Sequence, residues 1–180
     1  ILLALSKKSL TKKNLTESVE TTTEITAMVF MILLGSSIFS LVFRGFGGDD
    51  LITSIFNQLP GGTFGAVLLV MVLIFLLGFI LDFIQITLVV VPIVGPALLM
   101  LGVDPIWLGI MIAINLQTSF LTPPFGFALF YLRGVAPDSL ATKDIYKGVI
   151  PFILIQLMVL VALAIFPELV TALPNAVYGS

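Results

Sequence analysis

The sequence predicts an all-α integral membrane protein, and its composition and its apolar pattern both support this fold class. Of its 180 residues, 59% are hydrophobic and only 10% are charged, and the mean hydropathy is +1.21. A soluble globular domain typically carries about 25% charged residues. The apolar residues also gather in segments of roughly 20 residues or more, the length at which a helix crosses a bilayer. A soluble enzyme, a nucleic-acid-binding protein and a disordered chain are therefore excluded.

The side chains that serve most enzymes and transition-metal sites are missing. The chain has no cysteine and no histidine, so it forms no disulfide, no thiolate site and no imidazole general base. It also lacks a glycine-rich phosphate loop followed by Lys and Ser or Thr, which argues against direct use of ATP. We expect no enzymatic activity, no transition metal and no cofactor. Because the chain opens with Ile1 inside an apolar run, we expect it to be the C-terminal part of a longer protein.

Residues 1–24 are expected to be the end of a preceding helix and a cytoplasmic connector. The polar stretch 6–24 is interpreted as solvated and partly helical, and its four lysines mark the cytoplasmic side under the positive-inside rule. Residues 25–62 are expected to hold a transmembrane helix, at about 25–43, and a periplasmic interfacial segment. In that segment, apolar residues recur at helical spacing and predict a short helix lying at the membrane surface.

Residues 63–102 form one long apolar stretch with a single charge, Asp82, near its centre. The stretch fits either two full crossings joined at Asp82 or a re-entrant helical hairpin whose tip stops near the midplane. Charge placement favours the hairpin. With a hairpin, Lys143 and Lys147 fall on the same cytoplasmic side as the N-terminal lysines. With two full crossings and a re-entrant segment after them, both lysines would lie outside, against the rule.

Residues 103–135 are predicted to form a transmembrane helix that is broken in its middle. Pro123 and Pro124 stand there, and proline removes a backbone donor and clashes with the preceding turn. Residues 136–180 are expected to hold a cytoplasmic loop, a last transmembrane helix at about 146–166 and a periplasmic tail.

Two interruptions, at 78–83 and 119–126, are expected to meet at one depth. Irregular backbone is tolerated inside a membrane where it lines a polar cavity, and broken helices mark the binding sites of secondary transporters. Freed carbonyls suit a cation such as Na⁺, and freed N–H groups suit an anion. Asp82 is singled out because an ionisable residue at membrane depth is costly.

Simpler interpretations stand beside these. The break can be a proline kink that Thr122 caps, and Asp82 can be a pairing residue at a loop. Ser36, Ser37 and Ser40 can serve helix packing instead of binding.

A motif around the two prolines resembles a known family. The run Asn115–Phe130, N-L-Q-T-S-F-L-T-P-P-F-G-F-A-L-F, resembles the N-L-x-x-x-x-[IL]-T-P-P-x-G-x-x-L-F signature of the large membrane subunit of TRAP (tripartite ATP-independent periplasmic) transporters. Thr26-Ala27, the G-x-x-x-D pattern of residues 78–82 and the L-G-V-D-P of residues 101–105 match in the same order. The resemblance covers roughly residues 20–175. The form Q-T-S-F-L-T-P-P-F-G-F-A-L-F-Y-L-R-G looks like the branch named for mannitol or chloroaromatic compounds.

The resemblance implies a function as well as a fold. Members of the family are Na⁺ symporters of the bacterial inner membrane that work by an elevator mechanism. They import an organic acid or related solute that a periplasmic binding protein delivers, and a small membrane subunit braces the large one. This chain would be the C-terminal part of the large permease, an elevator half with a re-entrant hairpin and a discontinuous transmembrane helix. Its partners would be those two proteins and the lipid bilayer, with no nucleic acid.

The resemblance also implies site residues. Seven residues would bind Na⁺ through backbone carbonyls and the Thr122 hydroxyl: Gly78, Leu81, Asp82, Phe83, Ser119, Thr122 and Phe125. Three more would shape the site: Pro123, Pro124 and Gly126. Four polar residues would lie at the cavity: Ser37, Ser40, Asn115 and Gln117.

The sequence departs from the common family pattern at three positions. Phe83 stands where proline often follows the aspartate, Ser119 where glycine is common, and Ala128 where asparagine is common. Phe83 and Ser119 still supply carbonyls, whereas Ala128 has no polar side chain to offer a substrate. Two other functions remain open: another ion- or proton-coupled carrier, and a membrane scaffold subunit that transports nothing.

Overall fold

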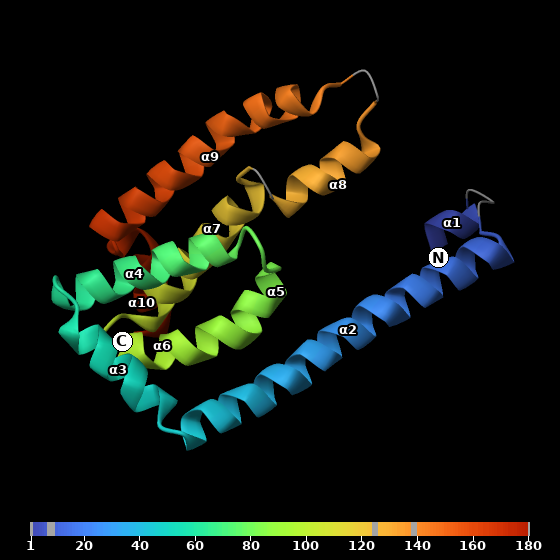
Figure 1. The fold of residues 1–180 in the computed structure, drawn as a ribbon. Helices are drawn as coiled ribbons and strands as arrows, with labels where there is room; N and C mark the ends of the chain where they lie inside the picture. Colours follow the sequence, from blue (N-terminus) through green and yellow to red (C-terminus); the bar gives the residue numbers. More distant parts are fainter. Residues whose placement is uncertain (1, 7–9, 124–125, 138–139, 180) are drawn as a thin grey trace.

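The computed structural model describes residues 2–6, 10–123, 126–137 and 140–179, and within these ranges the chain is helical and has no strand (Figure 1). By length and composition, three stretches of the described chain can cross a membrane: Lys12–Gly45, Phe83–Met100 and Thr142–Ile165. The all-helical fold class of a multi-pass membrane protein is thus confirmed.

A short helix, α1 (Leu2–Ser6), precedes one long helix, α2 (Lys12–Gly45). The α2 helix begins at Lys12, so it includes most of the polar stretch expected to be partly helical and continues into the expected transmembrane segment. The Thr11 hydroxyl caps it by accepting the N–H of Asn14 at 3.2 Å. The polar residues that follow contain no glycine or proline, and the Lys13–Glu17 pair at 3.7 Å has the helical i, i+4 spacing. Lys7 and Lys8 lie outside the described residues.

Residues 63–102 form a helical hairpin, as expected. Its first arm is α4 (Gly62–Leu77), and its return arm is α5 (Phe83–Gln85), the π-helical turn η1 (Ile86–Val90) and α6 (Val91–Met100). The Thr63 hydroxyl closes the base by donating to the Leu101 carbonyl at 3.4 Å. With 16 residues, α4 is about 24 Å long, shorter than the roughly 30 Å of hydrocarbon in a bilayer. The depth of the tip in the membrane stays a prediction.

The expected interfacial helix is α3 (Gly48–Gln58), and the chain bends by 116° between α3 and α4. This bend turns α3 under the hairpin, where it packs against α6 and α4. Its position relative to a membrane surface also stays a prediction.

Residues 103–135 form a broken helix, as expected. The first half, α7 (Pro105–Leu121), starts at the hairpin base, where an Asp104 carboxylate oxygen accepts the N–H of Trp107 at 2.8 Å. The chain leaves the helix at Thr122, and α8 (Phe127–Val135) begins after Gly126. Because α4 and α7 both start at the base, both end beside the hairpin tip (Figure 1).

The core lies between the two arms of the hairpin and α7. It consists of buried apolar side chains from α4, α6 and α7: Ala66, Val67, Val70, Met71, Ile74, Val94, Ala97, Leu98, Leu108, Met111, Ile112 and Leu116. The last long helix, α9 (Thr142–Ile165), packs along α7. The segment expected to be a periplasmic tail contains a helix, α10 (Glu168–Tyr178), and Val170 of this helix packs against the core.

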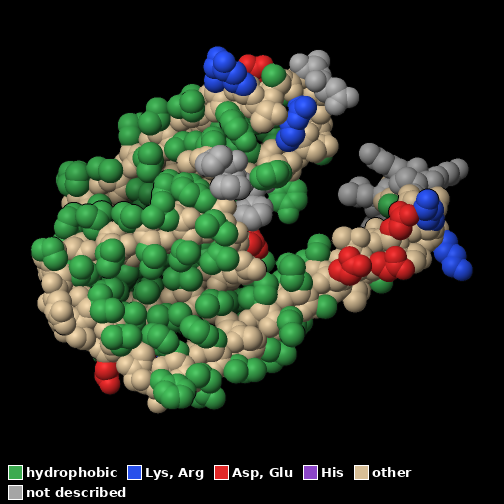
Figure 2. All heavy atoms as spheres, viewed as in Figure 1, with side chains coloured by type: hydrophobic (Ala, Val, Ile, Leu, Met, Phe, Trp, Pro, Cys, Tyr) green, Lys and Arg blue, Asp and Glu red, His purple; other side chains and the backbone are tan. Residues whose placement is uncertain are grey.

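Many large hydrophobic side chains are exposed, and they spread over the face drawn in Figure 2, as is typical of a lipid-facing protein. Charged side chains gather on the N-terminal part of α2 and near the turn between α8 and α9. The α2 helix packs mainly against α3 and η1, so most of its side chains are exposed.

Candidate functional site

The hairpin tip, residues 78–82, begins at a glycine that lies against α7. Gly78 is buried and donates its N–H to the Ile74 carbonyl at 2.9 Å. A β-carbon on Gly78 would lie 2.7 Å from the Ser119 β-carbon and closer still to its hydroxyl. Only glycine permits this approach of the tip to α7.

Asp82 closes the tip as the N-terminal cap of the return arm. One of its carboxylate oxygens accepts the N–H of Phe83 at 2.9 Å, and the Gln85 side-chain oxygen accepts the Asp82 N–H at 3.3 Å. This reciprocal arrangement is a capping box, and it places the carboxylate at the positive end of the return arm. The D-x-x-Q spacing is a sequence signal for the box, and sequence reasoning missed the role of Gln85.

The tip also exposes carbonyl oxygens. The N–H groups of residues 78–81 donate back to carbonyls of the last turn of α4. No backbone N–H of the described residues donates to the carbonyls of residues 78–81 themselves. These oxygens therefore keep their lone pairs for another partner, and carbonyls of irregular backbone bind ions in transporters.

The helix break has a definite local cause. Pro123 and Pro124 have no N–H to donate to the carbonyls four residues earlier. The Thr122 N–H donates to the Ser119 carbonyl at 3.1 Å, and the Thr122 hydroxyl donates to the Thr118 carbonyl at 2.7 Å. The hydroxyl oxygen keeps its lone pairs for another partner. Pro123 is half-buried at this turn, and Pro124 and Phe125 lie outside the described residues.

Gly126 lies against the carbonyl end of α7. A β-carbon at this position would be 2.9 Å from the Phe120 carbonyl oxygen and 3.0 Å from that of Thr122. Its N–H donates to the Thr122 carbonyl at 3.1 Å. Glycine therefore lets the chain fold back closely over the end of α7 before α8 begins.

The structure brings the tip and the break together. Gly78 contacts Ser119, and the Phe83 and Phe120 rings meet edge to face with centroids 6.2 Å apart and an angle of 89°. Leu81 and Asp82 lie in the loop between these two contacts, and Thr122 ends the helix one turn after Ser119. Sequence reasoning did not single out Phe120, because an aromatic residue among apolar ones carries no signal of its own.

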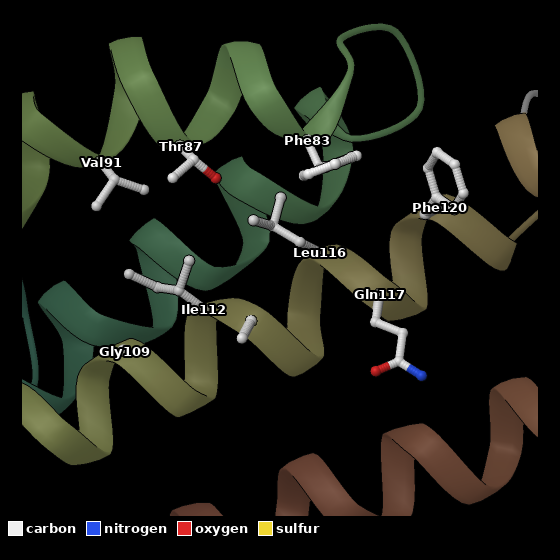
Figure 3. Close-up of a pocket in the computed structure, with 9 residues that line it drawn as sticks. Phe83, Thr87, Val91, Gly109, Ile112, Leu116, Gln117 and Phe120 are labelled. Atoms are coloured by element: carbon white, nitrogen blue, oxygen red, sulfur yellow. The ribbon is translucent and has the colours of Figure 1, made fainter. Parts of the chain in front are cut away.

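A groove of about 490 Å³ lies between the return arm and α7. Phe83, Thr87 and Val91 line one side of it, and Ile112, Leu116 and Phe120 line the other (Figure 3). Gln117, a residue expected at the cavity, is exposed at the edge, and its carboxamide points away from the return arm.

The other expected cavity residues lie elsewhere. Asn115 is buried, and its side-chain N–H donates to the Met71 carbonyl at 2.8 Å, so it joins α7 to α4. Ser37 is exposed, and its hydroxyl donates to the Leu33 carbonyl at 2.8 Å. Ser40 is half-buried, one turn beyond Ser36 on the same face of α2. Ser36 is the buried serine, and it lines a hollow of about 380 Å³ with Leu81 and Gln85.

These features define a class of protein. A multi-pass helical bundle in which a hairpin tip meets a broken helix is the architecture in which secondary transporters build their binding sites. A family model described as "Tripartite ATP-independent periplasmic transporter, DctM component" matches residues 1–169. The chain belongs to this family.

Known relatives agree with the family. The sialic acid TRAP transporter large permease protein SiaM of Vibrio cholerae is 27% identical over 171 residues, which are 95% of this chain and 40% of the relative. The ectoine/5-hydroxyectoine TRAP transporter large permease protein UehC of Ruegeria pomeroyi is 28% identical over 172 residues, 96% of this chain and 40% of the relative. The C4-dicarboxylate permease DctM of Vibrio cholerae is 35% identical over 91 residues, 51% of this chain and 20% of the relative.

The chain therefore spans 40% of the length of SiaM and of UehC. The relatives are named as transporter permeases and not as enzymes, which supports a role outside catalysis.

Proposed function

We propose that this chain is part of the large membrane subunit of a Na⁺-coupled TRAP transporter that imports an organic acid across the bacterial inner membrane. The observation that supports this proposal most strongly is the contact between the hairpin tip and the broken helix, at Gly78 and Ser119. A periplasmic binding protein delivers the substrate, and a small membrane subunit braces the large one. Import follows from an elevator movement of the hairpin and the broken helix as one body.

Helix direction supports a cation at this place. The α4 helix ends at Leu77 and α7 ends at Leu121, so two carbonyl ends converge beside the tip. Each helix C-terminus carries the equivalent of roughly half a negative charge. The open carbonyls of residues 78–81 and the lone pairs of the Thr122 hydroxyl supply hard oxygen ligands, which Na⁺ prefers. The Asp82 carboxylate adds a full negative charge in the same loop.

Helix direction also indicates where the anionic substrate would bind. Asp82 already caps the N-terminus of the return arm, so that end is neutralised. The α8 helix instead begins at Gly126, which has no side chain with which to cap it. An uncapped helix N-terminus attracts carboxylate oxygens. We therefore propose that the substrate carboxylate lies beside the start of α8.

The substrate is proposed only by class. The two relatives that cover most of this chain are named for sialic acid and ectoine, and a shorter match is named for C4-dicarboxylates. The sequence around the two prolines looks like the mannitol or chloroaromatic branch, so we propose polyols and aromatic acids as further candidate substrates. Thermal-shift screening of the periplasmic binding protein that works with this permease, with organic acids, polyols and aromatic acids, would identify the ligand.

The central test uses two variants that keep the fold. Asp82→Asn retains a side-chain oxygen for capping, since Asn and Asp are comparable caps, but removes the charge. Thr122→Val keeps the shape of the side chain and removes the hydroxyl. We expect the Na⁺ concentration for half-maximal uptake to rise by about tenfold in each, the change that corresponds to 1.4 kcal/mol of binding free energy. Uptake is measured in proteoliposomes containing the complete gene product, the small subunit and the binding protein.

The outcomes separate the alternatives. Unchanged Na⁺ dependence in both variants contradicts the site assignment. Uptake that a pH gradient drives and that Na⁺ does not affect favours a proton-coupled carrier, with Asp82 as the acid in the tip. Absence of uptake in the parent protein with each candidate substrate and both partners favours a scaffold subunit.

A further inference from the structure

The two ends of the hairpin tip contact consecutive residues of α7. At the entry end, Gly78 lies against the side chain of Ser119, and at the exit end the Phe83 ring meets the edge or face of the Phe120 ring. The loop between these two contacts, residues 79–81, carries carbonyls that would bind the cation. Movement of this loop away from the break would have to open one contact or the other.

We propose that Gly78, Phe83, Ser119 and Phe120 form a clamp that sets the distance between the tip and the helix break. In this clamp, Gly78 allows close approach because it has no side chain, and the side chains of the other three residues fix the position of the tip. The backbone carbonyls of the tip are then held in place to bind a cation. The proposal rests on the proposed function and adds a role that backbone ligands do not have. Backbone ligands need only a carbonyl, which any residue offers, whereas the clamp depends on the size and shape of these four residues.

At the entry contact, there is room for a β-carbon on Gly78 or on Ser119, but not on both. The Ser119 side chain is 1% exposed, and its hydroxyl donates to the Leu116 carbonyl at 2.9 Å. Rotation of the hydroxyl would not relieve a clash with a methyl group on Gly78, because the backbone fixes the Ser119 β-carbon, which would lie 2.7 Å from that methyl group. A methyl group at position 78 must therefore push the tip away from α7. Removal of the Ser119 side chain removes the two closest contacts and leaves the Ile74 carbonyl oxygen at 3.3 Å.

The exit contact is a pair of rings held at right angles. Edge-to-face pairs place the positive edge of one ring on the negative face of the other, so the contact has a preferred geometry. The Phe83 ring is half exposed, and together with Phe120 it forms the end of the groove nearest the tip (Figure 3). A leucine at position 120 would keep apolar contact but lose this orientation.

The first test moves the side chain at the entry contact from residue 119 to residue 78. Gly78→Ala should raise the Na⁺ concentration for half-maximal uptake by about tenfold, with maximal uptake at saturating Na⁺ little changed. The double variant Gly78→Ala with Ser119→Gly should return this concentration to within about twofold of the parent. A role in folding alone would lower the amount of protein in the membrane and leave the Na⁺ dependence unchanged. A double variant as impaired as Gly78→Ala overturns the size-matching proposal.

The second test does not need transport. The chain has no cysteine, so Ile80→Cys places a single thiol in the tip, at a position 73% exposed. Cysteines elsewhere in the complete gene product are replaced first. We measure the rate of maleimide labelling in proteoliposomes, with and without Na⁺. Phe120→Leu should raise the labelling rate severalfold, and Phe64→Leu, an exposed phenylalanine near the hairpin base, should leave it unchanged.

The two proposals fail in different ways. Equal labelling rates in the parent, the Phe120→Leu variant and the Gly78→Ala variant would show that the tip is not clamped, whatever the protein transports. A parent protein whose labelling and uptake both ignore Na⁺ would contradict the proposed coupling, while a faster rate in the clamp variants would still support the clamp.

Discussion

The indole N–H of Trp107 donates to the Leu163 carbonyl at 2.7 Å, and this bond joins α7 to α9. In an uninterrupted helix, the N–H of residue 167 would occupy that carbonyl, but residue 167 is proline and has none. Trp107 therefore satisfies a carbonyl that the end of α9 leaves open.

We predict that Trp107→Phe lowers the free energy of unfolding by about 0.5–1.5 kcal/mol, because a carbonyl in an apolar bundle loses its donor. Thermal unfolding in detergent measures the change. In a Pro167→Ala background, residue 167 supplies an N–H, so the same Trp107→Phe change should cost less. Equal costs in the two backgrounds would mean that the bond contributes nothing.

Asn115 and Gln117 give a second prediction, because they are similar amides on one helix. Asn115→Leu removes the bond to the Met71 carbonyl and should destabilise the protein by about 0.6–2 kcal/mol, the range found for polar bonds between membrane helices. Gln117→Leu, at an exposed position, should change stability by less than about 0.5 kcal/mol. Melting curves of the two variants side by side check the difference, and similar losses would contradict the role of Asn115.

The capping box gives a third prediction, which concerns stability and not uptake. Asp82→Ala should cost about 1 kcal/mol through loss of the N-cap, whereas Asp82→Asn should be nearly neutral. Gln85→Ala removes the reciprocal bond and should cost less than Asp82→Ala. Detergent melting temperatures rank the three variants. If Asp82→Asn proves as destabilising as Asp82→Ala, the carboxylate has a structural role beyond capping.

Gly126 gives a fourth prediction. Gly126→Ala would push a methyl group against the Phe120 and Thr122 carbonyls, so we expect a loss of about 1–3 kcal/mol and a fall in uptake. Gly134→Ala in α8 is the matched control, because the space beside Gly134 is open and alanine favours a helix by about 0.5–1 kcal/mol. The melting temperature and the uptake rate should therefore both fall for Gly126→Ala. For Gly134→Ala, both should rise or stay unchanged.

Much of the fold follows from local chemistry that the sequence displays. Two prolines end α7 because they carry no N–H, and the glycine and aspartate at 78 and 82 mark the two ends of the hairpin tip. The polar stretch expected to be partly helical is helical from Lys12 onward, since a polar segment free of glycine and proline remains helical when it continues a longer helix. The D-x-x-Q spacing at Asp82 indicates a capping box. The prediction at this position rested instead on the charge of Asp82 in an apolar stretch.

The sequence by itself determined a membrane-embedded helical protein with one hairpin and one broken helix, because breaks and caps depend on residues close together in the chain. Only the tertiary structure decided which groups meet: Gly78 with the Ser119 side chain, the Asn115 amide with the Met71 carbonyl, and Ser36 instead of Ser37 toward the tip. Neighbouring residues on a helix point about 100° apart, so a contact depends on how each helix is rotated. A helix that is apolar on every side, such as α4, has no sequence pattern to reveal that rotation. Packing between helices decides it.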